Sequence, residues 1–304
     1  MKLDYVDIIK KSWQIIWKYK WLWLFGFFAA LGSGGSNFSN FSRYSTNSGN
    51  TSTAGANFNQ FVSTYVVLII FVVLLLMAIG LAVTVASIIA QGALIGSAAA
   101  ADKEEPASLR LGWQIGLKYF WRLLGLGLLV GLVILFIVAI PIAVIVAAVV
   151  IGASAGSSMT PALFCLLPVG LVFLLILFVV AVLLGVSANY GSRYIVLDGA
   201  GVIDGLKRGF SLLRLRWIDT LLMYLLMGVI GTVVGLVLLI PGAAIGLPAL
   251  ALLIGGVAAK SIFIVATGVF VGMLAVLVMS ILNGVFVAYS SVVWTLVYRR
   301  LTAR

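Results

Sequence analysis

Long stretches of this chain carry no charged side chain. The longest runs from Leu123 to Ser192, and the others cover Tyr44–Ala101, Thr220–Ala259 and Ser261–Tyr298. A helix needs about 20 apolar residues to cross a bilayer, so each stretch can hold one or two spans. The residues do not alternate between polar and apolar, as the strands of a membrane barrel do. Because only helices and closed barrels satisfy their backbone in lipid, the pattern predicts an all-α integral membrane protein.

Three segments with a different pattern flank these stretches. Asp4–Lys20, Ser108–Arg122 and Asp204–Trp217 each place apolar residues on one helical face and polar or basic residues on another. The apolar face of the first is expected at Val6, Ile9, Trp13 and Ile16, and that of the third at Leu206, Phe210, Leu213 and Trp217. We predict three amphipathic helices at the inner membrane surface, because Trp and Lys or Arg suit that position.

The basic residues of these helices are candidates for binding lipid headgroups. Each such residue near an anionic surface contributes about 1 kcal/mol of attraction. The candidates are Lys11, Lys18, Arg110, Lys118, Arg122, Lys207, Arg208, Arg214 and Arg216. The alternative is that these charges only set the topology and anchor the neighbouring spans.

The first candidate span is the weakest. Trp21–Leu31 measures only about 16 Å as a helix, which is too short to cross alone. Either the span begins near Ile15, with lysines reaching back to the surface, or this segment is a half-helix. Residues 32–60 are rich in Ser, Asn and Gly, and we expect a flexible loop on the outer face.

Five further spans are expected, for a total of about six. Their expected landmarks are Phe61–Ala100, a third span from Leu123 with a kink or break at Pro141, an outer loop at Gly152–Pro161, a fourth span ending near Arg193, a fifth ending at Pro241 and a sixth beginning near Ser261. Pro248–Ala259 is apolar but only about 12 residues long, so we expect a re-entrant or interfacial piece there.

Rare residues recur along the chain at a spacing of about 100 residues. The recurring landmarks are Trp21, Trp121 and Trp217, then Pro141 and Pro241, then Gln91 and Asn189. We interpret them as three parallel repeats, 1–101, 102–198 and 199–304, each an inner amphipathic helix followed by a transmembrane hairpin. The repeats can sit around a pseudo-threefold axis or in a line. The alternative is a chance alignment of hydrophobic sequences.

The charges are distributed unevenly, and their distribution predicts the topology. The net charge is +11, and all basic residues except Arg43 and Lys260 fall on the side that also carries every acidic residue. The positive-inside rule makes that side cytoplasmic, with both termini inside. We therefore expect a multi-pass protein of the cell membrane, most simply a bacterial cytoplasmic membrane. The positive charge is explained by orientation, so nucleic acid is not expected as a partner.

The composition removes several kinds of chemistry. The chain has no histidine, so the commonest general base and metal ligand is absent. Its one cysteine, Cys165, lies in an apolar segment and excludes a disulfide framework and a cysteine metal site. Asp198, Asp204 and Asp219 could bind a metal at the inner surface, but capping helices is the simpler role. We predict no catalytic residues, no metal site and no cofactor, and hence a protein that is not an enzyme.

A few polar residues lie within the expected spans. Gln91, Asn189 and Asn283 are candidates for a polar substrate site, or for hydrogen bonds between helices. Lys260 is the isolated charge on the outer side; it either reaches lipid phosphate or recognises an anionic ligand. Pairs of small residues four apart favour close helix packing within the chain, or self-association. These pairs are Gly92/Gly96, Gly127/Gly131, Gly231/Gly235 and Gly268/Gly272.

Part of the pattern resembles a family of bacterial membrane proteins that includes the membrane domain attached to some glycerophosphoryl diester phosphodiesterases. The resemblance rests on Trp17-Lys-Tyr-Lys-Trp-Leu-Trp-Leu-Phe-Gly26, the Gly/Ser/Asn-rich segment after it, Arg193-Tyr-Ile-Val-Leu-Asp198 and the Gly-Leu-Lys-Arg-Gly-Phe210 that follows. It covers most of the chain, but these motifs are structural. The catalytic domain has no counterpart here, so the resemblance implies a membrane fold and no activity.

Two classes of function fit these observations. The first is a non-enzymatic scaffold, assembly subunit or lipid-organising protein, which agrees with the lack of deep ionisable groups. The second is a transporter or channel. Its substrate would be neutral or lipidic, because ion-coupled carriers usually keep charged residues inside the membrane and none is evident here. Expected partners are lipids of an anionic inner leaflet, together with a second copy of the chain or another membrane protein.

Overall fold

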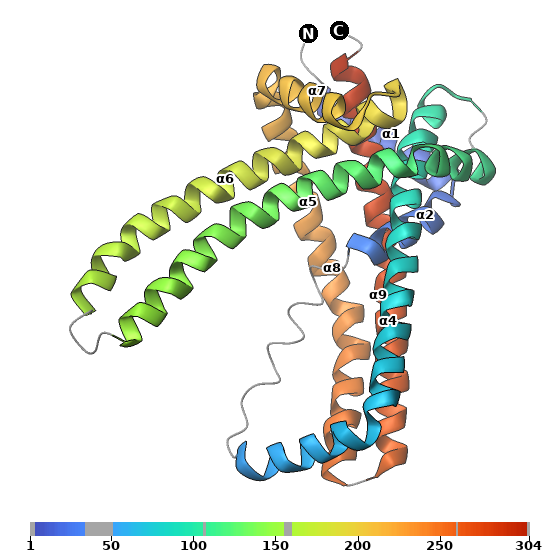
Figure 1. The fold of residues 1–304 in the computed structure, drawn as a ribbon. Coiled ribbons are helices and arrows are strands. Elements are labelled where there is room, and N and C mark those ends of the chain that lie inside the picture. Colours follow the sequence, from blue (N-terminus) through green and yellow to red (C-terminus); the bar gives the residue numbers. More distant parts are fainter. Residues whose placement is uncertain (1–3, 34–50, 106–107, 155–159, 260, 303–304) are drawn as a thin grey trace. The chain divides into compact units, whose positions relative to one another are not determined.

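The computed structural model describes residues 4–33, 51–105, 108–154, 160–259 and 261–302, and within these ranges all regular structure is helical. The elements are shown in Figure 1. They are α1 (Tyr5–Lys18), α2 (Leu22–Ser33), α4 (Thr51–Asp102), α5 (Leu109–Ser154), α6 (Thr160–Asp198), α7 (Val202–Leu215), α8 (Trp217–Ala258) and α9 (Ile262–Thr302). The all-α prediction is confirmed for this part of the chain.

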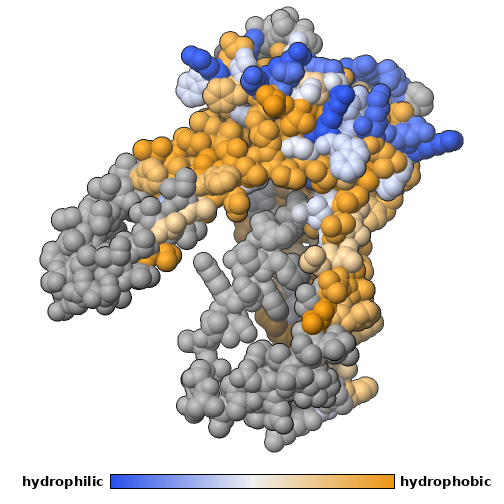
Figure 2. Space-filling view, in the orientation of Figure 1, coloured by the Kyte–Doolittle hydropathy of each residue, from blue (hydrophilic) through white to orange (hydrophobic). Residues whose placement is uncertain are grey.

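Five of the described helices are long and apolar enough to cross a membrane. The qualifying segments are Met77–Asp102, Leu109–Ala139, Phe173–Asp198, Trp217–Gly256 and Phe263–Thr302. Large apolar side chains lie exposed along them, as with Leu135, Leu225 and Phe263. Figure 2 shows hydrophobic residues covering the visible helix surfaces, with hydrophilic residues gathered near helix ends. A surface of this kind is stable in lipid rather than in water, which indicates a multi-pass membrane protein.

The chain forms two compact units. One consists of Lys118–Tyr224 with Tyr298–Arg304. In it, α7 packs on α6 through glycines: a Cβ atom added at Gly209 would lie 3.0 Å from the amide nitrogen of Gly191, and one at Gly205 would lie 3.2 Å from the Gly191 carbonyl oxygen. Contacts this short between backbones require the absence of side chains, so the glycines fix how closely the two helices approach.

The other unit consists of Lys2–Leu117 with Leu225–Val297. Here α2 packs against both α4 and α9. Ser87 of α4 donates a hydrogen bond to the carbonyl oxygen of Ala29 in α2. Against α9, a Cβ atom added at Gly26 of α2 would lie 2.8 Å from Ala288 Cβ. Gly284 of α9 packs equally tightly on Phe27 of α2. Leu22 and Phe25 are fully buried by these contacts, so α2 belongs to the core of this unit.

Of the two predicted alternatives for the N-terminal apolar segment, a span from Ile15 or a half-helix, the structure has the half-helix. α1 ends at Lys18 and α2 begins at Leu22, so no continuous helix runs from Ile15 through Leu31. α2 has 12 residues, about 18 Å, and falls short of a span. The predicted loop at 32–60 is wrong at its end, since α4 is helical from Thr51. The rest of that prediction, residues 34–50, lies outside the described residues.

Other predicted breaks are also wrong. α5 is continuous from Leu109 to Ser154, so the second amphipathic segment is its first part rather than a separate helix, and Pro141 does not interrupt it. α8 likewise continues through Pro241 and Pro248 to Ala258, which excludes the predicted end and the separate interfacial piece (Figure 1). A proline removes one backbone hydrogen bond, and the remaining bonds on either side sustain the helix in a long apolar segment.

The third amphipathic helix is confirmed as a separate element, and its limits, Val202–Leu215, are close to the predicted ones. α6 continues to Asp198, past the end predicted near Arg193. The predicted outer loop at Gly152–Pro161 has its two ends in α5 and α6, and its middle lies outside the described residues. Lys260 also lies outside the described residues. The division into three repeats stays a prediction.

Candidate functional site

α1 is an amphipathic helix with two kinds of apolar contact. Asp4 caps it, accepting a hydrogen bond from the amide of Asp7 at 3.1 Å, which satisfies one of the free N–H groups of the first turn. Its protein-facing side consists of Ile8, Ser12, Ile15 and Ile16. Val6 and Trp13, predicted on the same apolar face as Ile16, are 58% and 54% exposed. α1 therefore has apolar residues both toward the protein and toward its surroundings.

One ion pair and one aromatic contact connect α1 to two long helices of its unit. Lys11 Nζ lies 2.6 Å from Asp102 Oδ1, near the C-terminal end of α4. The Trp13 ring packs edge-on against Tyr289 of α9, with centroids 6.1 Å apart and an interplanar angle of 79°. Edge-to-face pairs of this kind add about 0.5–1.5 kcal/mol beyond their buried area. The two contacts hold α1 against the C-terminal parts of both α4 and α9.

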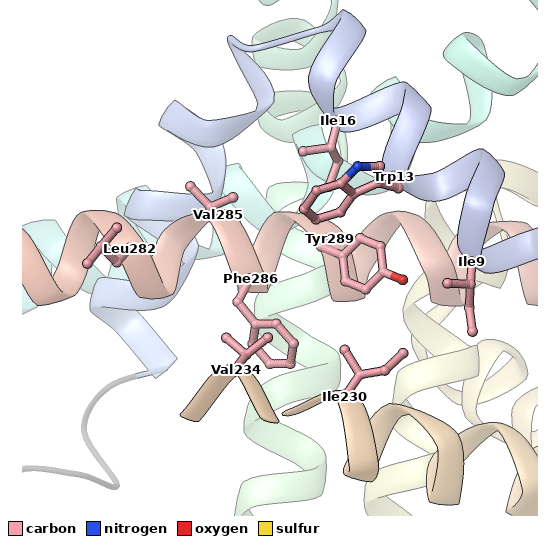
Figure 3. A pocket seen from close by; sticks show the side chains of 9 residues that line it. All are labelled: Ile9, Trp13, Ile16, Ile230, Val234, Leu282, Val285, Phe286 and Tyr289. Atoms are coloured by element: carbon pink, nitrogen blue, oxygen red, sulfur yellow. The ribbon is translucent and has the colours of Figure 1, made fainter. Parts of the chain in front are cut away.

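Beneath α1 lies a cavity of about 400 Å³, shared with α8 and α9. Figure 3 shows Ile230 and Val234 of α8 facing Phe286 and Tyr289 of α9, with Trp13 lying over Tyr289. The lining residues are Ile9, Trp13, Ile16, Ile230, Val234, Leu282, Val285, Phe286 and Tyr289. We call this the α1 pocket. Its volume falls within the range of about 300–1,000 Å³ typical of small-molecule sites.

The chemistry of the α1 pocket is almost wholly apolar. None of its lining residues is charged, and the Tyr289 hydroxyl and Trp13 indole N–H are its polar groups. A cavity needs several polar partners to hold ordered water, and apolar cavities stay dry. This arrangement can bind a hydrocarbon chain, and the Tyr289 hydroxyl is the only side-chain group in its lining that could exchange a proton in catalysis.

The predicted headgroup-binding residues lie mostly exposed on helix surfaces. Lys18, Arg110, Lys118 and Lys207 are exposed, as are Arg122, Arg208, Arg214 and Arg216, whereas Lys11 is partly buried by its ion pair. Some have protein partners. Arg122 donates to the Gly199 carbonyl oxygen at 2.6 Å, and Arg216 lies 3.8 Å from Asp219. Headgroup binding by these residues stays a prediction.

The three predicted intramembrane polar residues fall in both units. Gln91 and Asn283 belong to the unit that contains α1, and Asn189 belongs to the other. Gln91 is exposed and makes a long hydrogen bond of 3.4 Å to Ser87 of its own helix. Asn189 donates to the Tyr224 hydroxyl at 3.0 Å, which joins α6 to α8. Asn189 therefore makes the hydrogen bond between helices that was the alternative to a substrate site. A polar substrate site that includes Gln91, Asn189 and Asn283 stays a prediction.

The three candidate metal-binding aspartates are not clustered. Asp198 accepts a hydrogen bond of 2.8 Å from Tyr298, and Asp219 faces Arg216. Among the residues that the structure describes, no group of three or more His, Cys, Asp or Glu side chains could hold a metal ion. Asp204 lies in the first turn of α7, where the negative charge of an acidic side chain stabilises the free N–H groups of the helix end.

Sequence reasoning missed two features. The α1 pocket joins residues that are more than 200 positions apart, and only the Trp-bearing helix hinted at it. The second is Arg193, which is 5% exposed within α6 and surrounded by Asn189, Ser192 and tyrosines. Its signal in the sequence was an arginine five residues before the end of an apolar span.

A family profile matches the chain over residues 15–301, from the last turn of α1 to the end of α9. The chain belongs to DUF7544, a family of unknown function. The DUF7544 match includes every long apolar helix and most of the α1 pocket. No curated protein and no solved structure matches the chain. The resemblance to the membrane domain of glycerophosphoryl diester phosphodiesterases stays a prediction.

Proposed function

We propose that this chain is a non-enzymatic, multi-pass membrane protein that organises lipids by holding an acyl chain in the α1 pocket. The observation that carries the proposal is the cavity of about 400 Å³ between α1, α8 and α9, with its uncharged apolar lining. α8 and α9 are both long and apolar enough to cross the bilayer, so lipid is the surrounding solvent of this pocket.

The physical argument for an acyl chain is one of filling space. An empty cavity forfeits dispersion contacts along its whole lining, and water gains little from entering an apolar one. A hydrocarbon chain restores those contacts without leaving a polar group unpaired. Trp13 and Tyr289 have apolar rings and polar tips, which suit the level where chains meet headgroups.

Basic residues near the pocket support binding of anionic lipid. Lys18 is exposed at the end of α1, and the Lys11 side chain keeps 40% of its surface despite its ion pair. A lysine near an anionic membrane surface contributes about 1 kcal/mol of attraction. The proposal therefore has the acyl chain held by the pocket and its headgroup near the basic face of α1.

We place the protein in the cell membrane of a bacterium, with both termini in the cytoplasm. Supporting this, α1 contacts the C-terminal parts of both α4 and α9, through Asp102 and Tyr289. To test it, a cysteine replaces Glu105 in a Cys165→Ser background. A membrane-impermeant maleimide should label it in inverted vesicles and not in intact spheroplasts; the reverse pattern contradicts the orientation.

We also propose that the three repeats are real units of packing. The start of α5 packs on α4 through Gly112 and Gly116, where added Cβ atoms would lie 2.7 Å from Ser97 Oγ and 2.9 Å from Ile89 Cγ2. The glycines of α7 meet α6 in a similar way, again with a spacing of four residues. In both cases the inner helix of one repeat packs on the return helix of the preceding repeat, as related units would.

The pocket proposal is tested with two adjacent valines of α8. Val234 lines the pocket, whereas Val233 is 55% exposed on another face of the helix. Val234→Trp fills the cavity and Val233→Trp adds the same bulk outside it. With a phospholipid carrying a diazirine in its acyl chain, we expect crosslinks to the lining residues of α1, α8 and α9 to fall at least fivefold in V234W and to stay unchanged in V233W.

Two outcomes of this experiment contradict the proposal. One is equal crosslinking at the pocket in both variants. The other is uniform crosslinking along the exposed face of α8, as expected for bulk lipid. Transport of a lipidic substrate is the competing function, and it predicts that protein reconstituted in vesicles moves labelled lipid between leaflets. A rate equal to that of empty vesicles favours the organising role.

A further inference from the structure

A buried arginine lies in the unit that does not contain the α1 pocket. Arg193 is in the last turns of α6, inside the apolar segment Phe173–Asp198, and 5% of its surface is exposed. A charged side chain in such a position is costly unless it is paired, and it usually marks a functional site. The partners of Arg193 therefore decide its role.

One side of the guanidinium is anchored by its own helix. Nη1 donates to the backbone carbonyl oxygen and to the side-chain Oδ1 of Asn189, and it lies 3.3 Å from Ser192 Oγ. These oxygens are neutral, so they orient the arginine without balancing its charge. Asn189 is oriented in turn by its hydrogen bond of 3.0 Å to the Tyr224 hydroxyl of α8.

The other side of the guanidinium has no partner in the described part of the chain. Nε is buried and makes no hydrogen bond, and none is present from Nη2. No described carboxylate pairs with Arg193. Asp198 accepts from Tyr298 at 2.8 Å, and Asp219 lies 3.8 Å from Arg216. The Nε–Nη2 edge is the one that binds two oxygens of a carboxylate or phosphate side by side.

We propose that Arg193 is the centre of a binding site for a phosphate group, which its Nε–Nη2 edge holds by two parallel hydrogen bonds. Arg193 lies five residues before the end of α6, about 7.5 Å along the helix axis, a length comparable to the thickness of one headgroup layer, about 5–7 Å. Its neighbours Asn189, Ser192 and Tyr224 are only partly buried, so a ligand would approach Arg193 from the surface beside them. Neither the residues nor the ligand group are shared with the α1 pocket.

The phosphate can come from a lipid headgroup or from a soluble phosphate ester. The full-length protein, stripped of lipid in a neutral detergent, is titrated with short-chain phosphatidylglycerol, with glycerol phosphate and with inorganic phosphate, while bound ligand is read by native mass spectrometry and by melting temperature. Binding of the lipid alone identifies a headgroup site, and binding of the soluble ions identifies a soluble ligand.

Two variants isolate the role of the arginine. Arg193→Gln removes the charge and the two-pronged edge. The control Lys103→Gln removes an exposed basic residue just after α4 that is not among the candidate headgroup-binding residues. We expect R193Q to weaken binding of the phosphate ligand at least tenfold and K103Q to change it less than twofold. Arg193→Lys keeps the buried charge but loses the two-pronged geometry, so it should weaken binding about fivefold and remains informative if R193Q does not fold.

A readout on the unchanged chain completes the test. Phosphatidylglycerol with a diazirine in its headgroup should crosslink to residues 189–193 if the ligand is a lipid. Equal binding by the wild-type protein and a folded R193Q or R193K variant overturns the proposal, and so does the absence of both headgroup crosslinks and soluble phosphate binding. In either case the role of Arg193 would be confined to its hydrogen bonds within α6.

Discussion

α1 and α7 are both amphipathic helices of 14 residues, yet they attach to the protein in different ways. α7 presents Gly205 and Gly209 to α6, and the two backbones meet closely. α1 presents Ile16, Trp13 and Ile9 to its neighbours, and a cavity remains beneath it. Glycines allow a helix to pack against another backbone, whereas large side chains hold it away and leave space for a ligand. Helices of similar pattern can thus act as a structural layer or as the lid of a pocket.

The glycine contact of α7 gives the largest expected effect. In Gly209→Ala the new methyl group would lie 3.0 Å from the Gly191 amide nitrogen and would also overlap the Ser187 carbonyl oxygen. Overpacking of this kind costs about 1–3 kcal/mol. We expect a clear fall in the melting temperature of the detergent-solubilised protein, measured by loss of the monodisperse peak after heating.

A matched glycine provides the control for this variant. Gly228 of α8 is exposed, and nothing lies within 4 Å of an added Cβ atom there. Gly228→Ala should be neutral, or stabilising by up to about 1 kcal/mol, because alanine favours the helix. If both substitutions lower the melting temperature equally, close packing of α7 on α6 is not what fixes this helix.

The aromatic contact of α1 gives an intermediate effect. Trp13→Ala removes the edge-on contact between Trp13 and Tyr289, and we expect the free energy of unfolding to fall by about 0.5–1.5 kcal/mol. We also expect weaker acyl-chain crosslinking in the α1 pocket. Trp121→Ala is the control, since Trp121 is 77% exposed and its ring contacts the adjacent Phe120. Equal crosslinking in W13A and wild-type protein would mean that Trp13 does not cover the pocket.

The ion pair of α1 gives the smallest effect. Lys11 and Asp102 lie 2.6 Å apart, but their side chains keep 40% and 15% of their surface. Partly exposed pairs contribute up to about 1 kcal/mol. A double-mutant cycle with Lys11→Ala and Asp102→Ala should give a coupling energy in that range, and it should shrink as salt is raised. A coupling several times larger would show that this pair, rather than apolar contact, holds α1 in place.

The sequence predicted the limits of a helix well where helix-breaking residues mark its ends. α7 was found within two residues at each end, because Gly199 to Gly201 separate it from α6 and its basic residues differ from the apolar spans. The amphipathic start of α5 has the same kind of pattern but no breaker before Leu123, so the helix continues. Pro141 was predicted as a kink or break and Pro241 as the end of a span, yet the hydrogen bonds on either side of each keep the long helix continuous.

The candidate sites were harder to predict than the helices. Val234 and Trp13 are ordinary residues of an apolar helix and an interfacial helix, and only the fold brings them to one cavity. Arg193 was visible as a charge near a helix end, but its buried state depends on Tyr190, Tyr224 and the end of α9 around it. Of the predicted apolar face of the third amphipathic helix, Leu213 is buried, whereas Phe210 is 49% exposed and Trp217, at the start of α8, is 59% exposed. Gly205 and Gly209 are buried on α7, which the apolar pattern did not indicate.

The position of α2 has a consequence for how the chain is made. α2 packs on Ser87 of α4 and on Gly284 of α9, about 260 residues after Gly26. At a synthesis rate of about 5–20 residues per second, Gly284 leaves the ribosome roughly 10–50 s after Gly26. At 12 residues, α2 is too short to cross the bilayer by itself during that interval. Ser87 follows Gly26 by only about 60 residues, so α2 can pack on α4 early, whereas its contact with α9 forms only once Gly284 has been made.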